Sequence, residues 1–198
     1  MRIAIDVNGV LRDTLTKIQQ VYERWYIDNQ IKETEDEDFK YEIISDVTTL
    51  DLAKHLKFKD EDEIYNFLYV DHTMEIFGHS PSVEMNTFVD LNDFYFDNRD
   101  EHEILVVSDE IGKSKPATLF FISKFGCQLE KVKFYSKVTL DNLWDELDIL
   151  VTANPELILN HPKDKKIIKF ETKYNENIDC AIRIGNIKEL TDIDFKHV

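Results

Sequence analysis

Near its start the chain reads Arg2-Ile3-Ala4-Ile5-Asp6-Val7-Asn8-Gly9-Val10-Leu11-Arg12-Asp13-Thr14, and this stretch decides the fold that we expect. A short apolar run is followed at once by a carboxylate, an Asn-Gly turn and a long amphipathic segment. This pattern is typical of a buried strand that carries an acid at its carboxyl end before the chain turns into a helix. Because ligands of open α/β sheets bind beyond the carboxyl ends of the strands, Asp6 is predicted to lie at the mouth of a site. A carboxylate there can act as a nucleophile or bind a divalent cation.

The composition is that of an ordinary globular protein. With 198 residues, 42% of them hydrophobic and 32% charged, the chain is long enough for one α/β domain that carries a small inserted subdomain. A net charge of −16 disfavours nucleic acids and anionic membranes as partners, because both would be repelled. Phosphorylated small molecules would also be repelled unless a metal or a lysine cluster reversed the field at the site.

The cysteines and histidines indicate neither a disulfide framework nor a zinc site. Cys127 and Cys180 are the only two cysteines, so a reducing cytoplasmic setting is expected. The six histidines have neither the HExxH spacing nor a cysteine partner, and the five glycines form no phosphate-binding loop. The sequence shows no charged-then-apolar leader and no long apolar run, so neither secretion nor membrane spanning is expected.

Four further apolar runs read as strands, and each is followed by polar residues. They cover residues 103–108, 131–135, 148–152 and 165–170, after the first at 2–7. Residues 15–29, 39–77 and 83–96 have helical spacing, and Thr14 is a candidate N-cap for the first of these helices. The pattern predicts an α/β fold, a three-layer sandwich with a parallel five-stranded sheet, and several helices between its first two strands.

The first strand and its turn resemble motif I of the haloacid dehalogenase-like (HAD) phosphatases, Asp-x-Asp-Gly-Thr/Val-Leu. The resemblance makes Asp6 the catalytic nucleophile and a magnesium ligand. Asn8 stands where the family has its second acid, which protonates the leaving group and offers its backbone carbonyl to magnesium. An amide residue can still supply that carbonyl, but it cannot carry a proton.

Two further family motifs are matched at strand ends. Ser108 ends the strand 103–108, as in motif II, whose hydroxyl holds a phosphate oxygen. Motif III supplies a lysine that neutralises the nucleophile and the transferred phosphoryl group, and Lys137 is our first choice for this catalytic and phosphate-binding role. Lys113 and Lys115 are the alternatives.

The fourth motif is kept in outline but has lost its acids. The strand 148–152 is followed by Asn154-Pro155-Glu156, as in motif IV, yet Thr152 and Ala153 stand in place of its two carboxylates. Asp148 cannot replace them, because four extended residues put it about 13 Å away at the other end of the strand. Magnesium prefers carboxylate oxygens, so with Asp6 and Asn8 as its remaining ligands Mg²⁺ would bind weakly.

The resemblance also implies how the chain is organised. Residues 1–14 and 97–198 would form the HAD-like Rossmannoid core, and residues 15–96 a small helical cap inserted into it. The end of the chain, with Tyr174-Asn175 and residues 183–190, is similar to that of the small 5'-nucleotidase and deoxyribonucleotidase-like members.

Three hypotheses on function follow. The first is a catalytically impaired relative that acts by binding a small phosphorylated molecule or a protein partner. The second is a magnesium-dependent phosphomonoesterase of the nucleotidase kind, with Asp6 as nucleophile and Asp13 or a water as the proton source. The third is metal-free dehalogenation through Asp6, which no other feature of the sequence supports.

Overall fold

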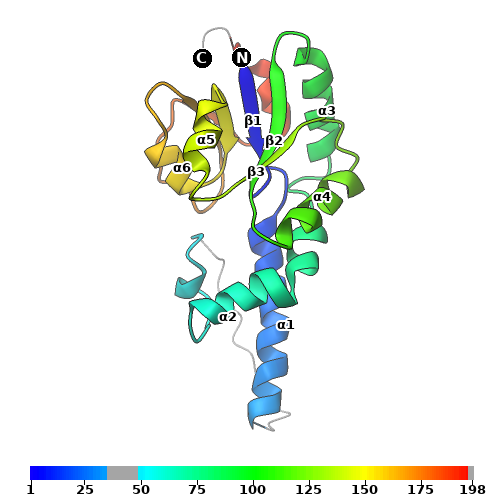
Figure 1. Ribbon diagram of the computed structural model, residues 1–198, viewed down its shortest axis with the longest axis vertical. Coiled ribbons are helices and arrows are strands. Elements are labelled where there is room, and N and C mark those ends of the chain that lie inside the picture. Colours follow the sequence, from blue (N-terminus) through cyan, green and yellow to red (C-terminus); the bar gives the residue numbers. More distant parts are fainter. Residues whose placement is uncertain (35–48, 196–198) are drawn as a thin grey trace.

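The computed structural model describes residues 1–34 and 49–195 and contains a parallel six-stranded sheet between helices (Figure 1). The strand order is β3-β2-β1-β4-β5-β6, and all neighbouring strands are parallel. The strands are β1 (Arg2–Asp6), β2 (Glu103–Asp109), β3 (Val132–Tyr135), β4 (Ile149–Thr152), β5 (Lys166–Phe170) and β6 (Ile182–Ile184). The predicted α/β sandwich is therefore confirmed.

The predicted number of strands was one too low. β6 spans three residues at the edge of the sheet, and only Ile184 among them is buried. So short and half-exposed a strand has no apolar run that would distinguish it from a loop.

Helices cover both faces of the sheet. On one face lie α3 (Thr87–Asn98), α4 (Ser114–Lys124) and the 3₁₀ helix η4 (Ile187–Asp192), and on the other lie α5 (Leu140–Asp145) and α6 (Pro155–Asn160). The side chains of β1 alternate between these layers, with Ile3 and Ile5 packed on the α3 side and Ala4 on the α5 side. All three are fully buried, as expected for the central strand of a parallel sheet.

The helices between β1 and α3 form a separate apolar cluster beyond the carboxyl edge of the sheet, at the end of the molecule opposite the N-terminus (Figure 1). They are α1 (Thr14–Thr34), the 3₁₀ helix η1 (Leu52–Lys54), α2 (Glu61–Asn66) and the π-helical turns η2 (Phe67–Asp71) and η3 (Met74–Gly78). Part of the predicted helical stretch 39–77 lies outside the described residues.

The cap boundaries, residues 15–96, stay a prediction. The cluster beyond the sheet draws its buried residues from positions 18–77 and from Ala117 of α4. The apolar residues of α3, in contrast, pack in the cluster of the sheet, where Leu91 and Phe94 are fully buried. The chain thus returns to the sheet layer before residue 96.

The start of α1 differs from the expectation. Thr14 is the first helical residue rather than the cap, and the Asp13 carboxylate accepts a hydrogen bond from the backbone N–H of Thr16 at 3.3 Å. The Thr14 hydroxyl is used elsewhere, donating to the side-chain oxygen of Asn8 at 2.8 Å. None of the helices in the described part of the chain, α1 included, is both long and apolar enough to cross a membrane.

Candidate functional site

A cavity of about 460 Å³ lies at the carboxyl edge of the sheet, where it meets the helices that follow β1. The ends of β1, β2 and β3 bring Asp6, Asp109 and Tyr135 to its wall. Its other lining residues come from the loop after β1, from α1 and the other helices beyond the sheet, and from the loops after β4 and β5. They include Asn8, Gly9, Asp13, Ile18, Leu52, Leu68, Tyr69, Phe77, Asn154, Lys173 and Tyr174. The cavity therefore has an acidic end and an apolar, aromatic end.

Asp6 is the buried acid of this cavity, with 2% of its surface exposed. Its Oδ2 accepts hydrogen bonds from Thr152 Oγ1 at 2.8 Å and from the Tyr135 hydroxyl at 3.5 Å. Its Oδ1 has no hydrogen-bond partner within residues 1–34 and 49–195. Burial, together with the nearby Asp109, raises the pKa of Asp6 to about 7, against the lowering effect of the hydrogen bonds from Thr152 and from the backbone of Asn8 and Val7. At neutral pH the site thus holds a carboxyl group that is about half protonated.

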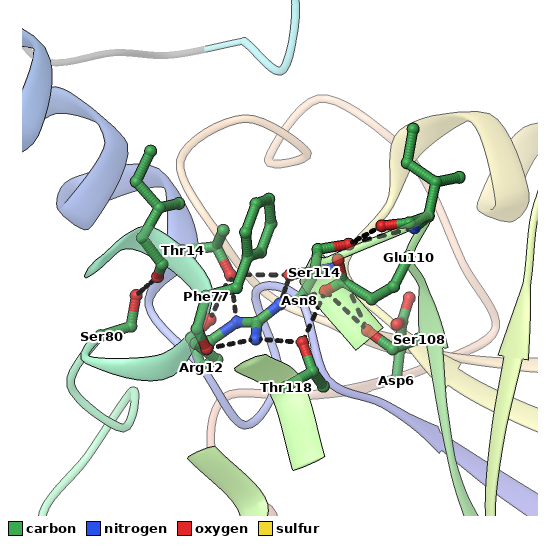
Figure 2. Close-up of polar contacts among 12 residues, drawn as sticks. Asp6, Asn8, Arg12, Thr14, Phe77, Ser80, Ser108, Glu110, Ser114 and Thr118 are labelled. Carbon is green, nitrogen blue, oxygen red and sulfur yellow. Dashed lines mark hydrogen bonds and ion pairs between the residues drawn. The ribbon is translucent and has the colours of Figure 1, made fainter. Parts of the chain in front are cut away.

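Asn8 faces a second, internal group of residues (Figure 2). Its Oδ1 accepts hydrogen bonds from the Arg12 guanidinium at 2.7 Å and from Thr14 at 2.8 Å. Its Nδ2 donates to Ser108 Oγ at 3.4 Å. The Asn8 amide thus accepts from two donors through its oxygen and donates to one acceptor through its nitrogen. An aspartate at this position could make the same hydrogen bonds only if its carboxyl group were protonated.

Arg12 is fully buried and uses its whole guanidinium (Figure 2). It pairs with the Glu110 carboxylate, donates to Thr118 Oγ1 at 2.6 Å and donates to the Phe77 carbonyl at 2.7 Å. The rings of Phe77 and Phe121 lie 5.1 and 5.4 Å from its central carbon. Arg12 therefore joins the loop after β1 to η3 and to α4.

Glu110 completes this network, which we call the Arg12 network: Asn8, Arg12, Thr14, Ser108, Glu110 and Thr118. Besides the ion pair, Glu110 Oε1 accepts hydrogen bonds from Ser108 at 3.2 Å and from Thr118 at 2.9 Å. Ser108 is fully buried and is not among the residues that line the cavity. Its hydroxyl, the predicted phosphate-binding group, is thus engaged inside the protein.

The register of β1 and β2 explains why Asp6 and Ser108 face different surroundings. Asp6 lies opposite Val107, so Ser108 is one residue further along its strand and points to the other face of the sheet. Asp6 consequently lies toward Tyr135 and Thr152, while Ser108 lies toward Arg12 and α4. The structure brings Asn8 together with Ser108, and Asp6 together with Thr152.

The three candidate lysines are all exposed. The charge of Lys137 lowers the pKa of Asp109, against the larger effects of burial and of Glu110, which raise it. Lys115 lies 5.8 Å from the centre of the Phe134 ring. Among the described lysines it is Lys173, in the loop after β5, that lines the cavity. The side chains that donate hydrogen bonds to Asp6 are those of Thr152 and Tyr135, and the role of Lys137 stays a prediction.

The residues present do not fit magnesium. Within the described residues, no three carboxylate, histidine or cysteine side chains are grouped so that they could hold a metal ion. The Thr152 hydroxyl already donates to Asp6. A hard cation needs several carboxylate oxygens, and Asp6 is the one buried carboxylate on this cavity wall.

Reasoning from the sequence missed Arg12, Glu110 and Tyr135. The first two carried a usable signal, because Glu110 directly follows β2, Arg12 lies in the loop that follows the adjacent strand β1, and parallel strands meet at one edge. Tyr135 was read as the end of an apolar strand, and its hydroxyl becomes relevant only because its side chain reaches across β2 to Asp6 on β1.

Gly9 allows the close approach of Tyr174, which forms part of the cavity wall. Its φ is +77°, and a Cβ atom built on it would lie 2.0 Å from the Tyr174 hydroxyl. Gly112 has a φ of +49°, but a Cβ there would meet nothing within 4 Å. An alanine at Gly112 would therefore suffer backbone strain alone, whereas an alanine at Gly9 would suffer the same kind of strain and a steric clash.

We expect Gly9→Ala to lower the free energy of unfolding by about 2–4 kcal/mol, through left-handed strain plus a clash. Gly112→Ala, the matched control, should cost only the strain, about 1 kcal/mol. Because the clash is mainly with a hydroxyl, Tyr174→Phe should recover part of the loss in the Gly9→Ala background. Urea unfolding of the four proteins checks this, and equal losses for both alanine variants would contradict the proposed role of Tyr174.

No family model matches this sequence, and no curated protein matches it. Solved structures do. A haloacid dehalogenase-like hydrolase from Burkholderia xenovorans superposes with a TM-score of 0.60 at 10% identity, over 98% of this chain and 96% of that one. A HAD-superfamily hydrolase of subfamily IA from Geobacter sulfurreducens has a TM-score of 0.57 at 11% identity, over 96% and 97% of the two chains.

A third similar structure is CbbY from Rhodobacter sphaeroides in complex with phosphate, with a TM-score of 0.57, 11% identity and coverage of 96% and 95%. At such identities the likeness shows the fold alone. The fold is thus that of the HAD-superfamily hydrolases, a parallel Rossmannoid sheet with helices beyond its carboxyl edge. The similarity extends over nearly the whole length of each chain.

Proposed function

We propose that this protein is a catalytically impaired relative of the HAD phosphatases that binds a ligand in the cavity beside Asp6. The observation that carries the proposal is the Arg12 network. It engages both the residue at the proton-transfer position, Asn8, and the predicted phosphate-binding hydroxyl, Ser108. A phosphoryl group would have to break buried hydrogen bonds to reach either of them, at a cost of about 1–3 kcal/mol each.

The charges at the cavity support the same proposal. Asp6, Asp13 and Asp109 line it, with Lys173 as the basic residue of the lining. A phosphate brought to Asp6 would meet further negative charge, because Asp109 is close enough to raise the pKa of Asp6, and Glu110 is close enough to raise that of Asp109. Transfer of a phosphoryl group needs cationic groups at that place, where their charge offsets that of the transition state.

A magnesium-dependent phosphomonoesterase of the nucleotidase kind is the second candidate. The unpaired Oδ1 of Asp6 favours it, because a nucleophile needs one oxygen free to attack. Asp13 lines the same cavity and could supply the proton that Asn8 cannot. Against it stand the poor fit to magnesium and the raised pKa of Asp6, which keeps part of the nucleophile protonated.

Hydrolysis of an aryl phosphate with millimolar magnesium separates the two candidates. We expect wild-type protein to show no turnover above the Asp6→Asn variant, which removes the nucleophile without changing its shape. Restoring the family acids with Asn8→Asp and Ala153→Asp should bring turnover that Asp6→Asn abolishes, since a general acid alone contributes about 10²–10⁴ in rate. Wild-type turnover that is lost in Asp6→Asn would instead establish the phosphomonoesterase.

A further inference from the structure

We propose that the cavity beside Asp6 binds a small organic cation, an ammonium group that carries an apolar or aromatic substituent. This inference rests on the proposed function, because it names the ligand of the same cavity. The sequence led us to expect a phosphorylated ligand. The side chains that line the cavity favour a cationic ligand instead.

The acidic end of the cavity offers one deeply placed acceptor. Asp6 Oδ1 is buried and has no hydrogen bond of normal geometry within the described parts of the chain, although the backbone N–H groups of Val7 and Asn8 lie close enough to lower the pKa of Asp6. Oδ2 of the same group accepts hydrogen bonds from Thr152 and Tyr135. An unpaired buried carboxylate oxygen costs free energy that a charged N–H donor would recover. This oxygen is therefore suited to accept from a ligand donor, and a fully ionised phosphate or carboxylate ligand carries no such donor.

Asp109 provides the second carboxylate. It ends β2, next to the end of β1, and it lies opposite Tyr135 in the register of β2 with β3. It also lines the cavity and acts electrostatically on Asp6. Glu110 is close by, but its charge is already paired with Arg12 inside the protein. Lys137 acts on Asp109 and Arg12 on Asp6 electrostatically, but neither acid has a direct ion pair among the described residues. Two such acids at one end of a cavity attract a cation, and the overall charge of −16 favours its approach.

The remaining wall suits the substituent of such a cation. Tyr69, Tyr135 and Tyr174 line the cavity together with Phe77, and the rings of Tyr69 and Phe77 stack with their centres 5.6 Å apart. Electron-rich aromatic faces attract ammonium groups and also bury apolar surface. Beyond them lie Ile18, Leu52 and Leu68 from the helices outside the sheet. A ligand with a cationic head and an apolar tail matches this order of side chains.

A volume of about 460 Å³ lies within the range of small-molecule sites and exceeds what a bare ammonium or metal ion would fill. A metal ion alone would also leave the aromatic half of the cavity without contact, and the described residues provide no cluster that could ligate one. The apolar half thus favours an organic cation over an inorganic one.

Calorimetric titration of the full chain with 2-phenylethylamine tests this proposal. We expect binding with a Kd at or below about 1 mM, a modest efficiency for a ligand of this size. The uncharged isostere 2-phenylethanol should bind at least about tenfold more weakly, because it lacks the charge that the two acids attract. Phenyl phosphate and magnesium chloride alone are the competing probes, and neither should bind or displace the amine.

Two aspartate variants connect the binding to the cavity. Asp109→Asn should weaken amine binding about tenfold, as expected for the loss of one charged partner. Asp100→Asn makes the same change in net charge in the exposed turn before β2, at the opposite edge of the sheet, and should leave Kd within about twofold. The side chain of Asp100 is exposed, and that of Asp109 keeps an exposed surface at the cavity although part of its carboxyl is desolvated, so both variants should fold.

Every other outcome overturns the ligand class. Equal binding of the alcohol, preferential binding of phenyl phosphate, displacement of the amine by magnesium, equal effects of the two variants, or absence of amine binding would each contradict it. The proposed function fails by a different result, wild-type turnover of phenyl phosphate that Asp6→Asn abolishes. The two failures are therefore distinguishable in the same set of proteins.

Discussion

Replacing Arg12 by methionine is expected to lower the free energy of unfolding by about 3–5 kcal/mol. Methionine keeps much of the volume of the side chain but leaves Glu110 without its cation, in a site where both side chains are fully buried. It also removes donors to the Asn8 and Phe77 oxygens and to Thr118. Urea or thermal unfolding measures the loss.

Arg24→Met is the matched control for this variant. Arg24 pairs with Glu75 at 2.6 Å, but more than half of its side chain is exposed. An exposed ion pair contributes about 0–1 kcal/mol, so the same substitution there should have little effect.

The double variant Arg12→Met with Glu110→Gln tests whether the cost comes from a charge left without a partner. Glutamine removes the charge of Glu110 while keeping its length, so the double variant should be more stable than Arg12→Met alone. Two results would contradict this explanation. One is an equal loss of unfolding free energy in Arg12→Met and Arg24→Met, and the other is a further loss when Glu110→Gln is added to Arg12→Met.

The second large effect concerns Asp6 and pH. Its pKa is about 7 in the folded protein, against 3.8 for an unperturbed aspartate. Between these values the unfolded chain has released the proton while the folded protein keeps it, so Asp6 makes the protein less stable as the pH rises from about 4 to 7. Above pH 7 both states are ionised, and the loss stays constant at about 4 kcal/mol.

Asp6→Asn should remove this cost, because an amide has no charge to bury. The variant should gain stability over wild type progressively between about pH 4 and 7, and the difference should then level off. Urea unfolding in the presence of a chelator, at several pH values from 4.5 to 8.5, measures that difference. Asp100→Asn, an exposed acid, should give a difference close to zero throughout. A difference for Asp6→Asn that does not grow with pH would show that Asp6 ionises normally in the folded protein.

Both effects arise from charged side chains that are buried at the carboxyl edge of the sheet. Arg12 and Glu110 neutralise each other inside the protein, while Asp6 and Asp109 remain without a basic partner in direct contact among the described residues. Stability and ligand choice are thus linked: the acids that disfavour folding at neutral pH are those that a cationic ligand would stabilise.

Much of the fold was predictable from residues close together in the chain. The strands β1 to β5 begin and end within one residue of the predicted limits, because each is a compact apolar run ended by polar residues. The position of Asp6 at the carboxyl edge followed from the same pattern and from the general place of ligands in parallel sheets. The prediction of Thr14 as the N-cap was wrong, because its hydroxyl donates a hydrogen bond to Asn8 and does not cap the helix.

The sequence by itself determined that an acid, a hydroxyl residue and several charged residues would come to one edge of a parallel sheet, since that depends only on where each strand ends. Only the tertiary structure decided which of them face each other. The pairing of Asp6 with Val107 turns Ser108 to the opposite side of the sheet. There it meets Glu110 and the buried Arg12, whereas Asp6 meets Thr152 and Tyr135. Side chains alternate along a strand, so a register that no local pattern reveals determines whether two strand ends form one site or two.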